Sequence, residues 1–171
     1  MVINGDLLLN KAPIKDMLGT KEARHGVSHG LSEAGYDIRI KQRIEFYPGK
    51  VLTFSMAVAD RNNPFGEIEH AGRFILASAI EEFQMPDDLM GIVHDKSTWA
   101  RQGLSVFNTV IEPGWFGHLT LELVYHGNSE LVIPAGSGIA QVVFHELSCR
   151  KAYTGKYQGQ PDMPVSAIQS K

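Results

Sequence analysis

The stretch His118-Leu-Thr-Leu-Glu-Leu-Val124 decides the fold class, because polar and apolar residues alternate along it from His118 to Leu123. Successive side chains of a β-strand point to opposite faces of the sheet. The three leucines therefore share one face, and the polar residues His118, Thr120 and Glu122 share the other. This pattern predicts a strand that buries its leucines.

The same two-residue period recurs along most of the chain, in short segments separated by turn residues. Many short strands with frequent turns are typical of a sandwich or barrel and not of alternating βαβ units, so we predict an all-β fold. No internal repeat or second domain is evident, and residues 1–171 are expected to form one domain. Further strands are expected at Tyr36–Ile40, Val51–Ala57, Arg73–Ile80, Leu89–His94, His118–Tyr125, Glu130–Ile133 and Gly138–Glu146, with turns at Asp60–Pro64 and Pro86–Asp88.

Three segments depart from the strand pattern. Met1–Leu18 predicts a helix with Asn4 or Asp6 as its cap and its apolar residues roughly on one face. Thr20–Gly35 is rich in Gly, Ser and His and predicts a loop. Tyr153–Lys171 has glycines and prolines but no apolar periodicity, so a frayed tail is its plainest interpretation.

Composition excludes several classes of function. The net charge of −3 gives no sign of nucleic-acid or anionic-membrane binding. Cys149 is the only cysteine, which excludes an internal disulfide and any site with two thiolates, and we expect it to be a small packed residue. The N-terminus shows no leader pattern and no stretch reaches 18 apolar residues, so a cytoplasmic location is expected.

The seven histidines give no indication of a metal centre. The sequence has no His-x-His pair, no His-Glu-x-x-His motif and no Pro-Cys-x-x-Cys motif. We therefore expect no zinc. Gly-x-Ser-x-Gly and a phosphate-binding P-loop are also absent from the sequence.

The segment Asp95–Gly103 follows an apolar strand and predicts a short helix capped by Ser97. Ser97 and Arg101 are four residues apart and share one helix face, with Lys96 at the entrance. Helix N–H groups together with a lysine, a hydroxyl and an arginine form a reasonable phosphate site. The alternative is a capped surface helix with solvated charges.

Glu122 is the strongest candidate for proton transfer. Burial in mid-strand would raise the pKa of this carboxylate, which suits a group that must both take and give a proton. The alternative is the exposed face of an antiparallel sheet, where Thr and Glu are commonplace.

Two further polar positions lie at turns. Glu112 begins the tight turn of Ile111–Gly117, where it is suited to bind a sugar hydroxyl or a water, or is simply a turn acid. Gln141 is the odd polar residue of the apolar strand after Ile133–Gly138, where it would otherwise face water.

Six segments, in this order, resemble the dCTP deaminase branch of the dUTPase superfamily over nearly the whole chain. Gly35 replaces the family's serine in the first segment. The segments are Gly35-Tyr-Asp-Ile-Arg39, Lys96-Ser-Thr-Trp-Ala-Arg101, Ile111-Glu-Pro-Gly-Trp-Phe-Gly117, the Leu-Glu pair within Leu119–Leu123, Ile133–Phe144 and Tyr153-Thr-Gly-Lys-Tyr-Gln-Gly-Gln160.

The resemblance implies a distorted jelly-roll protomer in a homotrimer, with active sites at the subunit interfaces. It implies zinc-independent deamination of a cytosine deoxynucleotide, with magnesium on the triphosphate and residues 153–171 as an active-site lid. The implied catalytic residues are Glu122, Arg101 and Ser97. The implied nucleotide contacts are Lys96, Ser97, Thr98 and Arg101 toward phosphate, Glu112 toward deoxyribose, Thr120, Leu121 and Glu122 toward the base, and Gln141, Tyr153, Lys156 and Gln160 toward phosphates or closing over them.

Besides Gly35, three residues differ from the family pattern. Lys96 replaces arginine, which loses bidentate phosphate geometry. Asp95 replaces glycine and brings an acid beside the expected phosphate site, and Glu112 replaces an aspartate that is one methylene shorter.

The product and the rival functions depend on the same resemblance. The loop from Val106 to Pro113 is short, like that of the members that release dUMP and diphosphate, so we predict dUMP rather than dUTP as the product. A deaminase that stops at dUTP and a dUTP diphosphatase are the alternatives. The diphosphatase branch usually has an apolar residue where this chain has Glu122. A non-catalytic nucleotide sensor remains open, whereas a cupin-type metalloenzyme lacks its histidine ligands.

Overall fold

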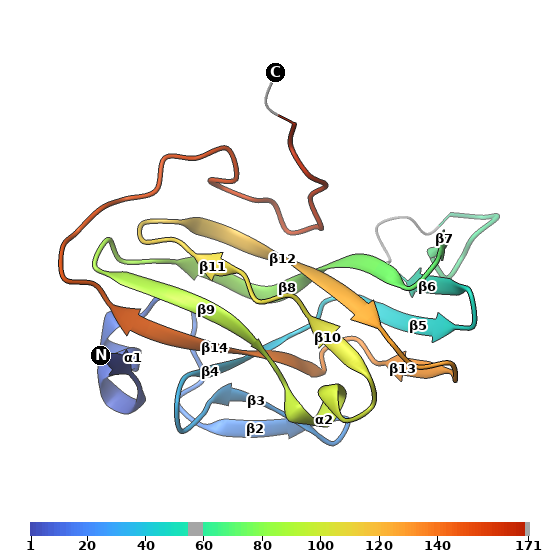
Figure 1. Ribbon diagram of the computed structural model, residues 1–171, viewed down its shortest axis with the longest axis horizontal. Helices are drawn as coiled ribbons and strands as arrows, with labels where there is room; N and C mark the ends of the chain where they lie inside the picture. Colours follow the sequence, from blue (N-terminus) through green and yellow to red (C-terminus); the bar gives the residue numbers. More distant parts are fainter. Residues whose placement is uncertain (55–59, 170–171) are drawn as a thin grey trace.

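The computed structural model describes residues 1–54 and 60–169, and most of its regular structure is β-strands in three antiparallel sheets (Figure 1). The predicted all-β class is therefore confirmed. The largest sheet has the order β11-β9-β14-β4-β3-β2, with β1 also paired to β14. Its strands are β1 (Val2–Ile3), β2 (Lys21–Arg24), β3 (Val27–Leu31), β4 (Tyr36–Arg39), β9 (Leu89–Asp95), β11 (Val110–Ile111) and β14 (Gly138–Glu146).

The two smaller sheets complete the protomer. One has the order β10-β12-β8 and the other the order β13-β5-β6-β7. Their strands are β5 (Arg43–Tyr47), β6 (Lys50–Phe54), β7 (Glu67–Ala71), β8 (Phe74–Gln84), β10 (Leu104–Val106), β12 (Phe116–Tyr125) and β13 (Leu131–Ile133). The helices are α1 (Gly5–Lys11) and α2 (Ser97–Ala100).

Strand β12 shows the alternation that its sequence predicts. Leu119, Leu121 and Leu123 are buried in the core, while the polar residues between them are only partly covered. The strand pairs with β8 along nearly its whole length, and Glu122 lies opposite Leu76. Burial of alternate leucines on one face stabilises β12 in this register, because a shift by one residue would expose all of them.

The N-terminal helix is much shorter than expected. Only Gly5–Lys11 is helical, and Asn4 is the N-cap residue, although its side chain donates to Glu33 O and not to the helix. The helix ends where Ala12 adopts a left-handed conformation (φ 46°) before Pro13, a residue that cannot continue a helix. The prediction of a helix to Leu18 was wrong because Pro13 was not given its weight as a helix breaker.

The predicted loop Thr20–Gly35 was also wrong, since it contains the hairpin of β2 and β3. His25 and Gly26 form its two-residue turn, and both have positive φ (54° and 77°). Such turns match the twist of the flanking strands, and Gly26 permits the conformation. The His-Gly dipeptide followed by alternating Val27–Leu31 was the signal that sequence reading missed.

Other strand boundaries shift only slightly. The predicted strand Gly138–Glu146 is confirmed residue for residue, and β8 extends to Gln84. The predicted strand Val51–Ala57 corresponds to β6, and its last three residues lie outside the described residues. Strands β5 and β7 were not predicted. The longest helix in the described chain has seven residues, and none of its helices is long and apolar enough to cross a membrane.

Candidate active site

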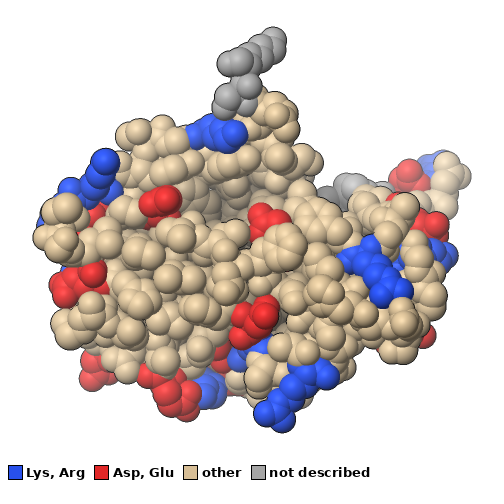
Figure 2. All heavy atoms as spheres, viewed as in Figure 1, with Lys and Arg blue, Asp and Glu red and all other residues tan. Residues whose placement is uncertain are grey.

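A cavity of about 520 Å³ lies between strand β12 and the C-terminal tail (residues 153–169). Figure 2 shows the surface hollowed beneath the tail, on a face where charged side chains are scattered. The apolar part of its wall comes from β8, β11 and β12, including Phe74, Leu76 and Val110. Five residues predicted from sequence line the same cavity: Glu112, Thr120, Glu122, Tyr153 and Gln160.

Glu122 is the chemically distinctive group of this cavity. It lies in the middle of β12, and its Oε2 atom is buried without a hydrogen-bond partner among the described residues. Desolvation by burial raises the pKa of this carboxyl above its ordinary value, while a hydrogen bond with its own backbone opposes the shift. A carboxyl in this state exchanges protons near neutral pH more readily than an exposed one.

Glu112 lines the same cavity, directly after the end of β11. Its carbonyl accepts a hydrogen bond from Trp115 N (3.2 Å), closing the tight turn that the sequence predicts. Gly114 takes positive φ (71°) at the third position of this turn, where Pro-Gly sequences favour type II geometry. The turn leaves the Glu112 side chain exposed at the cavity.

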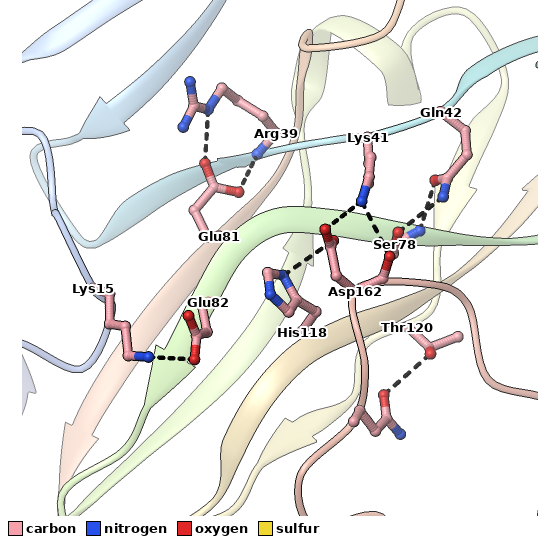
Figure 3. Close-up of polar contacts among 11 residues, drawn as sticks. Lys15, Arg39, Lys41, Gln42, Ser78, Glu81, Glu82, His118, Thr120 and Asp162 are labelled. Atoms are coloured by element: carbon pink, nitrogen blue, oxygen red, sulfur yellow. Dashed lines mark hydrogen bonds and ion pairs between the residues drawn. The ribbon is translucent and has the colours of Figure 1, made fainter. Parts of the chain in front are cut away.

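The tail is bound to β12 and the turn before it, so it is not frayed over the described residues. Tyr153 N donates to Pro113 O (2.7 Å), and the Trp115 indole donates to Tyr157 O (2.6 Å). Thr120 Oγ1 donates to the side chain of Gln160 (3.1 Å), a contact drawn in Figure 3. These bonds bring Tyr153, Tyr157 and Gln160 into the cavity wall.

Asp162 fastens the tail further along, a contact that sequence reading missed. Its carboxylate pairs with Lys41, and His118 Nδ1 lies 3.5 Å from it (Figure 3). Lys41 Nζ also donates to Asp162 O (3.1 Å). No local pattern identifies such a pair, because 121 positions separate Lys41 from Asp162.

Helix α2 holds a second set of predicted residues. The helix begins at Ser97 and its N-cap is Lys96, so the prediction that Ser97 caps it was wrong. Trp99 is buried and its indole donates to Gly138 O (2.7 Å), which anchors the helix to β14. Asp95 accepts from Val106 N (2.7 Å) and so ties β9 to β10.

The remaining α2 residues point outward. Ser97, Thr98 and Arg101 are exposed, and within residues 1–54 and 60–169 neither the Ser97 hydroxyl nor the Arg101 guanidinium has a hydrogen-bond partner. None of the three lines the Glu122 cavity of the single chain. They form an open polar surface that can receive an anion.

Lys96 and Gln141 lie together, outside the Glu122 cavity. Both bond to Asp37, a buried carboxylate of β4. Gln141 is therefore not a polar residue that merely faces water.

The other predicted residues lie apart from both groups. The Leu121 side chain is in the core, on the face opposite Glu122. Lys156 Nζ donates to Ile168 O and lies 5.3 Å from the centre of the Tyr157 ring, within the tail itself. Cys149 is exposed and unpaired, so the expectation that it is a packed residue was wrong, since it lies in the exposed segment that follows β14.

Comparisons with known proteins agree with the arrangement of these motifs. The family model described as dCTP deaminase-like matches residues 8–147. A Campylobacter jejuni protein named dCTP deaminase is 37% identical over 157 residues, covering 83% of this chain and 82% of the relative. A Helicobacter pylori protein of the same name is 37% identical over 155 residues, with the same coverage.

Solved structures show the same fold at low sequence identity. The 2'-deoxycytidine 5'-triphosphate deaminase of Agrobacterium tumefaciens superposes with a TM-score of 0.55 at 17% identity, covering 86% of this chain and 48% of that one. A mutant dUTPase from phage phi11 of S. aureus superposes with a TM-score of 0.52 at 12% identity, covering 83% and 92%. The dUTPase-like fold is therefore shown, as the sequence resemblance implied.

Proposed function

Because this chain belongs to the dCTP deaminase-like family, we propose that it removes the 4-amino group of dCTP by hydrolysis, with Glu122 moving the protons. The observation that carries the assignment is the Glu122 carboxyl, half-buried in a cavity with its Oε2 unpaired among the described residues. An exposed or ion-paired carboxylate would be a much weaker proton shuttle at neutral pH.

The reaction needs one group that first accepts and then donates protons. In this proposal the Glu122 carboxylate takes a proton from a water as the water oxygen bonds to C4 of cytosine, and it delivers this proton to N3. Glu122 then takes the second proton from the new C4 hydroxyl and passes it to the amino group, so the C4 carbonyl forms, the C4–N bond breaks, and ammonia leaves a uracil base. The pKa of Glu122, raised by burial, brings its two protonation states closer in free energy near neutral pH and so suits both halves of the cycle.

The catalytic constellation is completed by a second copy of the chain in a homotrimer. This assembly is supported by the separation of two groups within one chain: Ser97 and Arg101 are exposed on α2, whereas Glu122 lies in a cavity that they do not line. A neighbouring copy would bring its Ser97 and Arg101 to the cavity, where they would hold the water and stabilise charge at the amine.

We call Lys96, Ser97 and Arg101, together with the Asp37 that bonds Lys96, the α2 corner. The Glu122 cavity and the α2 corner would contact different parts of the nucleotide. Glu112 and Thr120 line the Glu122 cavity and would contact the deoxyribose and the base. The tail residues Tyr153, Lys156 and Gln160 would close over the phosphates as a lid. Magnesium in this proposal binds the substrate's phosphate oxygens and not the protein, and zinc has no part, because the carboxylate supplies the base.

A further step would hydrolyse the product to dUMP and diphosphate. The support for it is Glu112, whose exposed carboxylate shares the cavity of Glu122 and has no hydrogen-bond partner in the described chain. The loop between β10 and β11 is only three residues long, which leaves room for a water near the α-phosphorus. Glu112 would take the proton of that water as it attacks, and diphosphate would depart.

Product analysis tests both steps. The protein is washed with a strong zinc chelator, supplied with excess magnesium and incubated with dCTP, and ammonia, dUTP, dUMP and diphosphate are followed over time. We expect ammonia, dUMP and diphosphate to rise together. Accumulation of dUTP without diphosphate would limit the activity to deamination, activity restored only by zinc would reject the metal-free mechanism, and release of no ammonia would reject the deaminase.

A further inference from the structure

Asp37 is a buried carboxylate to which the proposed reaction gives no part. It lies on β4 with 2% of its surface exposed, directly opposite Gln141 in the ladder between β4 and β14. An isolated charge at such a position is costly, so its partners decide what it does.

Asp37 lies at the centre of a closed hydrogen-bond cluster. Its Oδ2 accepts from Lys96 Nζ and from Ser28 Oγ (2.9 Å), while Lys96 Nζ also donates to Ser28 Oγ (2.9 Å). Its Oδ1 accepts from Gln141 Nε2 (3.2 Å), which also donates to Ser32 Oγ (2.8 Å). The cluster joins β3, β4, β14 and the start of α2.

Counting donors shows what remains for a ligand. A lysine ammonium has three N–H donors, and the side-chain amide of glutamine has two. Lys96 uses two donors on Asp37 and Ser28 and keeps one, whereas Gln141 uses both on Asp37 and Ser32 and keeps none. In this arrangement Lys96 therefore keeps an N–H that can donate to a phosphate.

The cluster also removes freedom from Lys96. A lysine side chain loses rotamer entropy when it is held in one place. In this chain the Lys96 side chain is already mostly buried, with 11% of its surface exposed, and Asp37 and Ser28 hold its end. Substrate binding therefore does not have to order it.

We infer that Asp37 is the positioning residue of the phosphate site: it holds Lys96 with one N–H free for a substrate phosphate, and Gln141 braces Asp37 from β14. This inference rests on the proposed function for the identity of the substrate. Asp37 itself touches no substrate, and its effect passes through Lys96.

A double-mutant cycle tests this role, using the full-length protein with dCTP and magnesium. Asp37→Asn is nearly isosteric and removes the charge that holds Lys96, so we expect KM to rise about tenfold while kcat changes by less than about twofold. Lys96→Met should raise KM by at least as much. In the double variant, Asp37→Asn should add no further increase, because its target is gone.

Glu81→Gln is the matched control. Glu81 is also buried, lies on β8 and bonds to Arg39, outside the Asp37 cluster. We expect this variant to lose thermal stability and to keep the KM of the unmodified protein. An equal rise of KM in Glu81→Gln would show that loosening the core explains the effect, and would overturn the inference.

Two further outcomes would overturn it. If Asp37→Asn raised KM by the same factor with and without Lys96, the two residues would act independently. If Gln141→Met, which removes both N–H groups, raised KM by the same factor with and without Lys96, Gln141 would not act as a brace through Asp37 and Lys96.

A second variant, Ser28→Ala, tests the same role if Asp37→Asn folds poorly. Ser28→Ala keeps both charges and removes one bond of Lys96, so it should raise KM less than Asp37→Asn, and not at all beside Lys96→Met. If the unmodified protein releases no ammonia from dCTP, the proposed function fails. The same cycle measured as equilibrium binding of dCTP then tests the positioning role by itself, with the same expected pattern.

Discussion

The Glu122 cavity and the α2 corner contain the same kinds of side chain in opposite states. In the cavity, a half-buried carboxylate has an oxygen without a partner in the described chain, and burial raises its pKa. At the α2 corner, the more deeply buried Asp37 bonds to Lys96, Ser28 and Gln141. Burial alone prepares a carboxyl to exchange protons, whereas burial with full pairing makes it a rigid anchor.

Under the proposed function, neither region would be a complete site by itself. The cavity contains Glu122, the group proposed to transfer protons, and within the described chain Lys96 and Arg101 do not line it. The α2 corner has Ser97 and Arg101 at the surface and Lys96 beneath them, and no carboxyl among these described residues is unpaired like that of Glu122. The predictions that follow test this division, from the largest expected effect to the smallest.

Replacing Glu122 with Gln should lower deamination by about 100-fold or more, because an amide cannot take or give the proton. Binding of dCTP and assembly should change little, since the two side chains have nearly the same shape. Ammonia release and calorimetric binding measure the two effects. Glu146→Gln, at the exposed end of β14, is the matched control and should be fully active. Near-normal ammonia release by Glu122→Gln would remove the contrast between the two carboxylates.

Ending the chain after Leu147 should lower turnover by about tenfold or more while the sheets still fold. The tail forms part of the cavity wall but has no strand or helix, and only Tyr153 among its residues packs on the core. Steady-state kinetics and thermal unfolding, compared with the full-length protein, separate the two effects. Full activity without the tail would exclude a lid, and failure to fold would show that the tail is structural.

Mixing two inactive variants tests whether the regions come from different copies. Glu122→Gln and Arg101→Ala protomers are unfolded together, refolded as a mixture and assayed for ammonia release. If each site joins Glu122 of one copy to Arg101 of another, about a quarter of the sites in a random assembly are intact, and a corresponding activity should return. Variants refolded separately and then combined are the control. No recovery in the co-refolded sample would place both residues in a site of one chain.

The pH dependence of stability gives the smallest effect. The pKa of Glu122 in the folded protein lies above its value in the unfolded chain, so the folded state loses stability as pH rises through that interval. Glu122→Gln lacks this loss. We expect its Tm to exceed that of the unmodified protein at pH 7 and the difference to disappear at about pH 4, below the ordinary glutamate pKa. A difference that does not change with pH would show that folding does not raise the pKa of Glu122.

Local sequence patterns predicted the elements whose formation depends on residues that are close together in the sequence. The alternation in β12 depends on residues two positions apart, and it placed Glu122 on the partly covered face opposite the leucines. The Pro113-Gly114 turn and the strand Gly138–Glu146 were readable for the same reason. The motifs in their order identified the family, because each motif is a short contiguous segment that can be recognised without the structure.

Only the tertiary structure decided which of those residues act together. Lys96 and Asp37 are 59 positions apart, and Gln141 and Ser32 are 109 apart, so no window of sequence contains either pair. Glu122 and Asp37 differ in how deeply they are buried and in whether a hydrogen-bond partner reaches the carboxylate. Both properties depend on how the three sheets pack. The chain by itself therefore determined the strands and the candidate groups. The packing of those strands decided which buried carboxyl keeps an unpaired oxygen and which one pairs with a lysine.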